Sequence, residues 1–129
     1  MEPKKIVIVD DEPDVLESVA FALEAEGYKV VRAADGYQGF GAVRMEEPDL
    51  VILDVMLPGK NGYEVARMLR EDERKGVFRG CRILILTARK VDSAERQEFL
   101  ETWSGADLHL YKPFELNALT EAVRTLIDD

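Results

Sequence analysis

Cysteine and histidine are nearly absent from this sequence, which has one of each among 129 residues. Cys81 therefore cannot form an internal disulfide, and it has no Cys or His neighbour at metal-ligand spacing. The lone His109 has no second histidine with which to hold a metal. These shortages argue against a disulfide framework and against a metal site built on Cys and His, and we expect Cys81 to be structural and inert.

Long apolar runs and clusters of basic residues are also missing. Only four consecutive apolar residues, 6–9, precede Asp10, too few for a signal-peptide core or a membrane span. We therefore expect a cytoplasmic protein without membrane association. The net charge is −9, and no group of Lys and Arg offsets it, so we expect no direct nucleic-acid binding by this segment.

No Pro, Gly or Ser-rich linker, internal repeat or low-complexity tract divides the chain. The content of 47% hydrophobic and 33% charged residues fits a globular protein, and the length is sufficient for a core of its own. We expect one domain over residues 1–129.

Short apolar runs alternate with helix-length segments. The runs typical of strands cover residues 6–9, 29–33, 50–53, 83–86 and 108–111. This alternation predicts an α/β fold with a doubly wound, five-stranded parallel sheet and five flanking helices. The second and fifth runs contain Arg32 and His109, whereas the others are nearly pure Ile, Val and Leu, so the second and fifth strands should lie at the edges. A right-handed, flavodoxin-like sheet with those edges has the order 2-1-3-4-5.

The helical segments carry apolar stripes that should face the sheet. The stripe residues are Leu16, Val19, Ala20 and Leu23, then Phe40 and Val43, then Val65, Ala66 and Leu69, and finally Leu116, Leu119, Val123 and Leu126. The fourth segment, 94–103, is less regular, and its apolar residues Phe99, Leu100 and Trp103 either pack on the core or face a partner. We interpret the charged stretch 70–75 as a solvated helix extension.

Five polar residues stand at, or directly after, the ends of the predicted strands. They are Asp10, Asp11, Asp54, Thr87 and Lys112. Ligands of open α/β sheets bind outside the carboxyl ends of the strands, so we expect these residues to converge on one crevice. Three neighbouring carboxylates repel one another, and a hard divalent cation such as Mg²⁺ neutralises them. A hydroxyl and an ammonium beside such a cluster indicate a metal-assisted phosphoryl site.

Each of these residues also has a plain structural interpretation. Asp11 could cap a helix that has Pro13 in its first turn. Lys112 could simply end a strand in front of a proline, and Thr87 is a common residue at a strand end. A helix start does not explain Asp10, a further carboxylate at the end of a buried strand.

The residues at these positions resemble the response-regulator receiver domain, the family of the bacterial chemotaxis regulators. The matching stretches are Val-Asp-Asp at 9–11, Leu-Asp-Val-Met-Leu-Pro-Gly at 53–59, Leu-Thr-Ala at 86–88 and Lys-Pro-Phe at 112–114. The resemblance covers essentially the whole chain. It implies a two-component phosphorelay, in which a sensor histidine kinase, a phosphotransfer protein or a small donor such as acetyl phosphate phosphorylates an aspartate.

By this resemblance Asp54 would be the phosphoacceptor. Asp11 would ligate Mg²⁺ directly, and Asp10 would hold the ion mainly through water. The backbone carbonyl of Met56 would complete the protein ligands together with Asp54, and Mn²⁺ could replace Mg²⁺.

The resemblance also assigns a switch. Lys112 would neutralise charge on the transferred group, Thr87 would bind a phosphoryl oxygen, and His109 would rotate in response. Receivers more often carry Tyr or Phe at the position of His109, so an edge-strand His without a switching role stays open. Met56 and Arg89 occupy positions that admit or block the hydrolytic water, and we expect them to prolong the life of the phosphoryl group.

Phosphorylation would be read out on the face formed by the fourth and fifth helical segments and the fifth strand. The reader would be a downstream effector protein or a fused output domain, with a phosphorylation-dependent homodimer as a further option. The stretch between Thr87 and Lys112 is about one helical turn longer than in typical receivers, which should lengthen the fourth helix or its leading loop.

Three alternatives remain in view. A haloacid-dehalogenase-like phosphohydrolase also uses Asp, Mg²⁺, Thr and Lys, but its nucleophile comes first, as Asp-x-Asp. A flavodoxin-like flavin carrier would need Gly, Ser and Thr amides after the first strand, where this chain has carboxylates. A partner-binding pseudo-receiver would normally have lost one of the five residues. We therefore expect a phosphorylatable signalling domain and not an enzyme.

Overall fold

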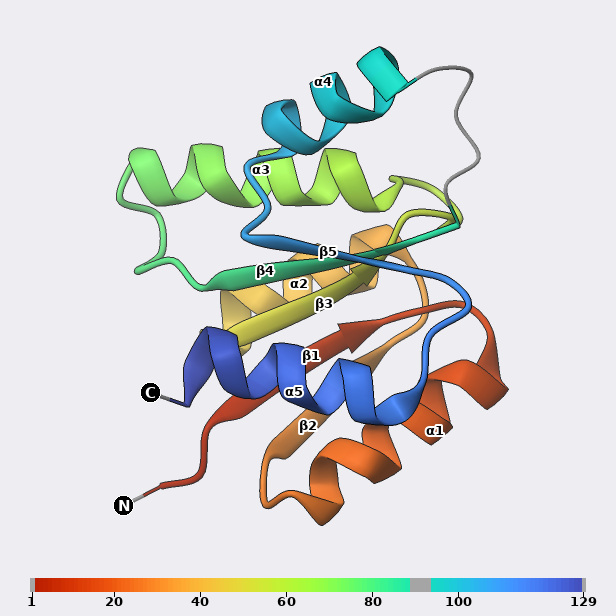
Figure 1. Ribbon diagram of the computed structural model, residues 1–129. Helices are drawn as coiled ribbons and strands as arrows, with labels where there is room; N and C mark the ends of the chain where they lie inside the picture. The colour runs from red at the N-terminus through yellow and green to blue at the C-terminus, as the bar shows by residue number, and fades with distance from the viewer. Residues whose placement is uncertain (1, 89–93, 129) are drawn as a thin grey trace.

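A computed structural model describes residues 2–88 and 94–128, and in these residues five parallel strands alternate with five helices (Figure 1). The strands are β1 (Lys5–Val9), β2 (Lys29–Ala33), β3 (Leu50–Asp54), β4 (Arg82–Thr87) and β5 (Leu108–Tyr111). Their order in the sheet is β2-β1-β3-β4-β5. The predicted fold class, strand order and edge strands are confirmed.

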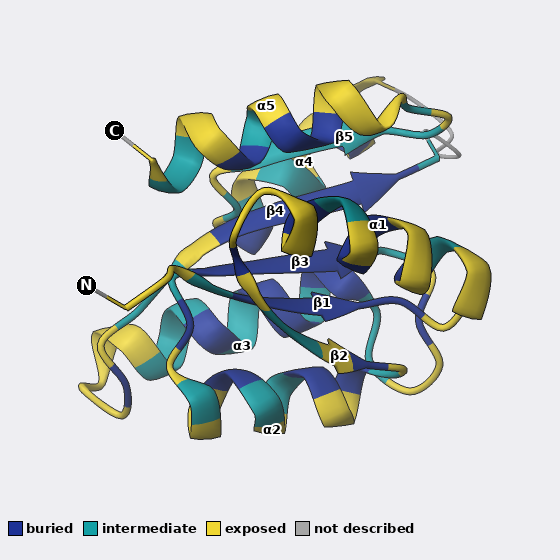
Figure 2. Ribbon diagram, turned by 90° about the horizontal axis from the view of Figure 1, so that it is seen from below, coloured by how far each residue is buried: buried dark blue, intermediate teal, exposed yellow. Residues whose placement is uncertain are grey.

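The helices lie on both faces of the sheet. They are α1 (Pro13–Ala25), α2 (Gly36–Glu46), α3 (Gly62–Arg74), α4 (Ala94–Ser104) and α5 (Leu116–Ile127). The cluster of buried residues on one face includes α1 and α5, and the cluster on the other includes α2 and α3, with part of α4 packed against it. The central strands are therefore covered on both sides, which explains their lack of polar residues (Figure 2).

Strand β1 shows how the two cores form. Its side chains alternate between the faces, so Ile6 and Ile8 pack with α1 and α5, whereas Val7 and Val9 pack on the other side. All four are at most 1% exposed. On the helix side, the predicted stripes of α1 and α3 are buried throughout.

The other stripes are shorter than predicted. In α5, Leu119 and Val123 are buried, but Leu116 is 43% exposed because it is the first residue of the helix and lines a surface cavity. In α4, the apolar residues differ in their environments. Leu100 and Trp103 pack against the core, whereas Phe99 is 62% exposed. The predicted extra turn before β5 falls partly on residues 89–93, which lie outside the described residues.

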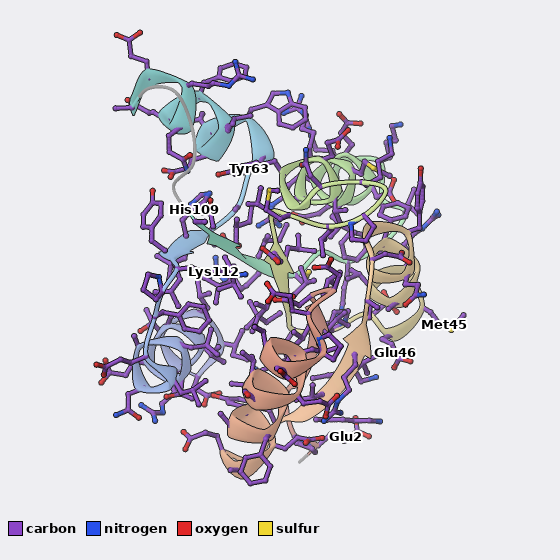
Figure 3. All side chains as sticks on the ribbon, turned by 90° about the vertical axis from the view of Figure 1, so that its right-hand side faces the viewer. Glu2, Met45, Glu46, Tyr63, His109 and Lys112 are labelled. Atoms are coloured by element: carbon purple, nitrogen blue, oxygen red, sulfur yellow. The ribbon has the colours of Figure 1, made fainter. Side chains whose placement is uncertain are left out.

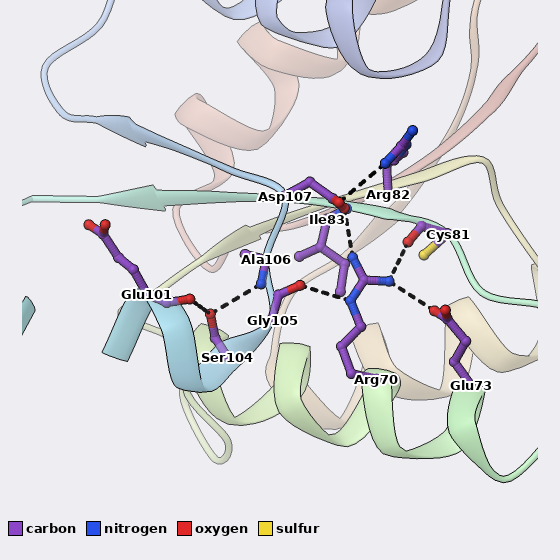
Figure 4. A network of polar contacts seen from close by, with 10 residues as sticks. All are labelled: Arg70, Glu73, Cys81, Arg82, Ile83, Glu101, Ser104, Gly105, Ala106 and Asp107. Atoms are coloured by element: carbon purple, nitrogen blue, oxygen red, sulfur yellow. Dashed lines mark hydrogen bonds and ion pairs between the residues drawn. The ribbon is translucent and has the colours of Figure 1, made fainter. Parts of the chain in front are cut away.

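The interpretation of the stretch 70–75 as only a solvated extension is wrong for Arg70, which anchors the end of α4 (Figure 4). Its guanidinium donates to the carbonyls of Gly105 and Cys81, each at 2.8 Å, and pairs with Asp107 at 2.6 Å. Sequence reasoning missed this contact because the partners lie 11 to 37 positions away. Burial also raises the pKa of the Cys81 thiol to about 12, as suits an inert cysteine.

The Arg70 anchor leads to a first prediction. Arg70→Ala removes the donor to two backbone carbonyls and one of the partners of Asp107, and we expect it to lower the free energy of unfolding by about 2 kcal/mol. Urea unfolding measures the change. Arg74→Ala, at an exposed position of the same helix, is the matched control. Equal stability of the two variants would contradict the anchoring role.

Candidate functional site

The predicted residues at the strand ends come together at the carboxyl edge of the sheet. Asp10 follows β1, Asp54 and Thr87 end β3 and β4, and Lys112 follows β5. The strand ladder continues past the strands, because Asp10 N donates to Ala33 O at 3.1 Å and Lys112 N donates to Thr87 O at 2.8 Å. These backbone bonds fix where the side chains emerge.

A tight start of α3 holds Asp54 in place. Gly62 begins this helix so close to β3 that a Cβ atom would lie 2.4 Å from the Asp54 carbonyl oxygen. Asn61 caps the helix, since its side chain accepts from Glu64 N at 2.9 Å while the Glu64 side chain accepts from Asn61 N at 3.2 Å. The loop after the phosphoacceptor candidate is thus fixed by a close packing contact and a capping box.

Two buried carboxylates face one ammonium at this edge. Asp10 is 1% and Asp54 is 2% exposed. Lys112 Nζ lies 3.3 Å from Asp54 Oδ2 and 3.9 Å from Asp10 Oδ2. Figure 3 looks onto this edge and labels Lys112 there. Among the described residues, Asp10 Oδ2 is buried and has no hydrogen-bond donor, so its charge is left for a cation to balance.

Burial sets the electrostatics of the two carboxyl groups. It raises the pKa of both Asp10 and Asp54, and their mutual repulsion raises that of Asp10 further. Lys112 lowers both pKa values without cancelling the effect of burial. Backbone donors act in the same direction as Lys112, since Glu12 N donates to Asp10 at 2.9 Å and Met56 N donates to Asp54 at 3.3 Å.

The carboxylates that gather closely in the described residues are Asp10, Glu12 and Asp54, whose oxygens lie within 4.8 Å of one another. Glu12 is the N-cap residue of α1 and the interpretation of Asp11 as the cap is wrong. Asp11 is exposed and near enough to raise the pKa of Asp54. The run of three acidic residues at 10–12 could have indicated that Glu12 belongs to the cluster, but acidic residues are also common at the start of a helix.

This donor set fits a hard divalent cation. Oxygens from three carboxylates lie close together, one of them is a buried oxygen without a donor, and Mg²⁺ prefers such ligands. The remaining candidates are less central. The Met56 side chain is 72% exposed, and Arg89 lies outside the described residues. His109 is half-buried on β5, where its ring faces Tyr63 and not the carboxylates.

A surface cavity of about 640 Å³ opens beside Lys112, between α1 and the start of α5. Its walls are mainly apolar, and Glu12 and Lys112 line it where it meets the acidic cluster. No helix in the described part of the chain is long and apolar enough to cross a lipid bilayer.

A doubly wound sheet with buried aspartates, a threonine and a lysine at its carboxyl edge is the arrangement that the resemblance to receiver domains predicts. The family model described as "Response regulator receiver domain" matches residues 6–124, and the chain belongs to this family. It is the receiver domain of a two-component response regulator.

Curated relatives and solved structures agree with this membership. The chain is 42% identical to the DNA-binding response regulator MtrA of Mycolicibacterium smegmatis, over 94% of this chain and 49% of MtrA. It is 40% identical to the alkaline phosphatase synthesis transcriptional regulatory protein PhoP of Bacillus subtilis, over 93% of this chain and 48% of PhoP. The chain thus spans about half the length of these relatives.

Among solved structures, the chemotaxis response regulator CheY4 of Vibrio cholerae superposes with a TM-score of 0.84 at 25% identity, over 97% of this chain and 99% of that one. The receiver domain of the sensor histidine kinase PA1611 of Pseudomonas aeruginosa superposes with a TM-score of 0.82 at 28% identity, over 98% and 99%. That structure is described with a magnesium ion coordinated in its active site cleft.

Proposed function

We propose that Asp54 of this receiver accepts a phosphoryl group from the phosphohistidine of a sensor histidine kinase or phosphotransfer protein. The observation that supports the assignment is a buried Asp54 carboxylate 3.3 Å from Lys112 Nζ, beside an Asp10 oxygen that has no donor in the described residues. Membership of the receiver family argues against the hydrolase and flavin-carrier alternatives. The intact-mass experiment below distinguishes the proposed function from a partner-binding pseudo-receiver.

The proposed transfer is a displacement at phosphorus. One Asp54 oxygen forms the new bond to phosphorus while the bond from phosphorus to the donor nitrogen breaks, and the imidazole leaves with the electron pair. Lys112 offsets negative charge on the transferred group. Thr87, 5% exposed at the end of β4, donates its hydroxyl to a phosphoryl oxygen after transfer.

A metal belongs to this proposal. Asp10, Asp11, Asp54 and the Met56 carbonyl would hold Mg²⁺, or Mn²⁺ in its place, and the ion when bound supplies charge neutralisation and orients the phosphoryl oxygens. Glu12 adds a further carboxylate near the ion, either directly or through water.

The output is also a proposal. Several relatives are named as DNA-binding or transcriptional regulators, and this chain covers the half of them that contains the receiver. We propose that phosphorylation changes the face of α4, β5 and α5 for a fused output domain or an effector protein in the cytoplasm, with a homodimer as one form of that response.

Intact mass spectrometry after incubation with acetyl phosphate and Mg²⁺ tests the function. We expect a gain of one phosphoryl group that is lost on chelation and in Asp54→Asn, and retained in Asp14→Asn, a carboxylate in the first turn of α1. No adduct together with steady phosphate release would indicate hydrolysis. No adduct and no release would indicate a pseudo-receiver.

Glu12 provides a second prediction. Glu12→Gln removes one charge from the carboxylate cluster, and we expect Mg²⁺ affinity to fall about three- to tenfold. Isothermal titration of the protein with MgCl₂ measures this, with Asp14→Asn as the control of equal charge change. Matching affinities in the two variants would place Glu12 outside the metal site.

Met56 and Arg89 provide a third prediction. We propose, from the family resemblance, that the side chains at these two positions slow the entry of water, so Met56→Asn together with Arg89→Ala should accelerate phosphoryl loss by about tenfold. The decay of phosphorylated protein, followed by intact mass after removal of the donor, reports the rate. An unchanged rate in the double variant would eliminate this tuning.

A further inference from the structure

A bridge of polar side chains holds α4 against α3 and β5. Gln97 Nε2 donates to Tyr63 Oη at 2.9 Å and to Glu101 Oε2 at 2.7 Å. Tyr111 Oη donates to the same Glu101 oxygen. We call Tyr63, Gln97, Glu101 and Tyr111 the α4 bridge, since they connect three elements through the buried side of this helix.

His109 lies beside the α4 bridge. Its ring centroid is 6.3 Å from that of Tyr63, with the ring planes at 36°, and Figure 3 labels the two side chains next to each other. Within the described residues, His109 Nε2 and Gln97 Oε1 are both buried without a hydrogen-bond partner. A buried polar atom without a hydrogen-bond partner is unfavourable, so a rearrangement that gives these atoms partners is favoured.

The charge that acts on His109 comes from the bridge itself. Burial lowers the pKa of His109, and Glu101 on α4 raises it. The neighbouring groups are the phenol of Tyr63 on α3 and that of Tyr111, two residues further along β5, while β4 presents Ile85 opposite His109. A protonated imidazole donates from both nitrogens, and Glu101 is a carboxylate whose charge acts on His109.

Protonation of His109 therefore competes with the bridge. Glu101 Oε2 already accepts from Gln97 and Tyr111, so an ion pair with His109 draws this oxygen away from them. The far end of α4 stays fixed, because Arg70 binds the Gly105 carbonyl. A response of α4 is therefore expected at the end that begins with Ala94, away from this anchor.

The bridge is also one strand pair from Thr87. In the β4–β5 ladder Thr87 lies opposite Tyr111, and Lys112 N donates to Thr87 O at 2.8 Å. A shift of Thr87 toward a phosphoryl group therefore acts on Tyr111, which is one arm of the α4 bridge. Phosphorylation and protonation of His109 therefore act on the same hydrogen bonds.

We propose that protonation of His109 opens the α4 bridge, so that acid and phosphorylation bias the same movement of α4. The part that concerns phosphorylation rests on the proposed function. By linkage, each event then favours the other by an equal factor.

A titration of His109 tests the proton-dependent half. This is the only histidine, so its ring protons give one resolvable NMR signal. We expect the pH at the midpoint of the His109 titration to lie below 6.5. We expect Glu101→Gln to lower it by about half a unit or more, and Tyr111→Phe to raise it because Glu101 is released for His109. Glu98→Gln, on the exposed side of α4, should leave it unchanged.

The fluorescence of Trp103 provides a second test of the proton-dependent part of the proposal. This residue is the only tryptophan and lies on α4, so its fluorescence should change with the His109 titration and lose that transition in His109→Phe. A midpoint that ignores both Glu101→Gln and Tyr111→Phe, or a fluorescence transition that persists in His109→Phe, overturns the proposal.

Loading with beryllofluoride and Mg²⁺, a stable mimic of a phosphorylated carboxylate, tests the coupling. We expect loading to raise the His109 midpoint by about one unit, which equals about tenfold tighter loading in acid. That acid gain should vanish in His109→Phe. A protein that takes up no beryllofluoride contradicts the proposed function and with it the coupling, whereas uptake with an unmoved midpoint overturns this inference alone.

Discussion

Asp54→Asn is expected to make the metal-free protein more stable while it abolishes phosphoryl uptake. The Asp54 carboxylate is 2% exposed and lies in a cluster with Asp10 and Glu12, so its charge opposes folding when no cation is bound. Removing the charge and keeping the shape should raise the free energy of unfolding at pH 7 by about 1–2 kcal/mol.

The pH dependence follows from the raised pKa of Asp54. Because the pKa in the folded state exceeds the ordinary value of 3.8, the folded protein holds this proton more tightly than the unfolded chain. The stabilisation by protonation is complete below 3.8 and is lost as pH rises through the folded pKa. The advantage of Asp54→Asn should therefore shrink as pH falls from 7 toward 4.

Urea unfolding in the presence of a chelator measures this effect, with Asp14→Asn as the control. Added Mg²⁺ should reverse the order of stability, because binding at one hundred times Kd stabilises the wild type by about 2.7 kcal/mol. An Asp54→Asn variant that is less stable than the wild type in chelator at pH 7 would show that the Asp54 charge does not destabilise the folded protein.

Lys112→Met is expected to have the largest effect on the rate of phosphorylation of any single change that keeps the Asp54 carboxylate. Lys112 lies within 4 Å of both buried carboxylates, so its removal leaves Asp10 and Asp54 without this cation and raises their pKa values further. The transferred group also loses a positive charge. We expect phosphorylation by acetyl phosphate to slow by about 100-fold or more.

Stability should fall as well, by about 1–3 kcal/mol at pH 7, a range reduced because Lys112 is 23% exposed. The loss should diminish as pH falls, since protonated carboxyl groups no longer need the ammonium. Phosphorylation rates by intact mass and urea unfolding at two pH values measure both effects. Lys29→Met, an exposed lysine on edge strand β2, is the control, and similar behaviour of the two variants would remove Lys112 from the site.

Prediction from sequence worked best for the parts that depend on local pattern. The strands were placed to within one residue at each end, because central strands covered on both faces are continuous apolar runs. The stripes of α1 and α3 were predicted correctly because a helix that packs on a sheet repeats its apolar residues at helical spacing. The prediction of buried residues was less accurate at helix ends, where Leu116 is exposed.

The sequence alone thus determined the element order, the strand order and the strand-end positions of Asp10, Asp54, Thr87 and Lys112, because in a parallel sheet these follow from hydrophobic periodicity and chain direction. Only the tertiary structure decided which side chains meet across elements.

Glu12 enters the carboxylate cluster, Arg70 binds the end of α4, and the α4 bridge joins three elements beside His109. These contacts join residues that lie tens of positions apart in the sequence, such as Glu12 with Asp54 and Arg70 with Gly105. They depend on the directions of individual side chains after packing, which no periodicity in the sequence encodes.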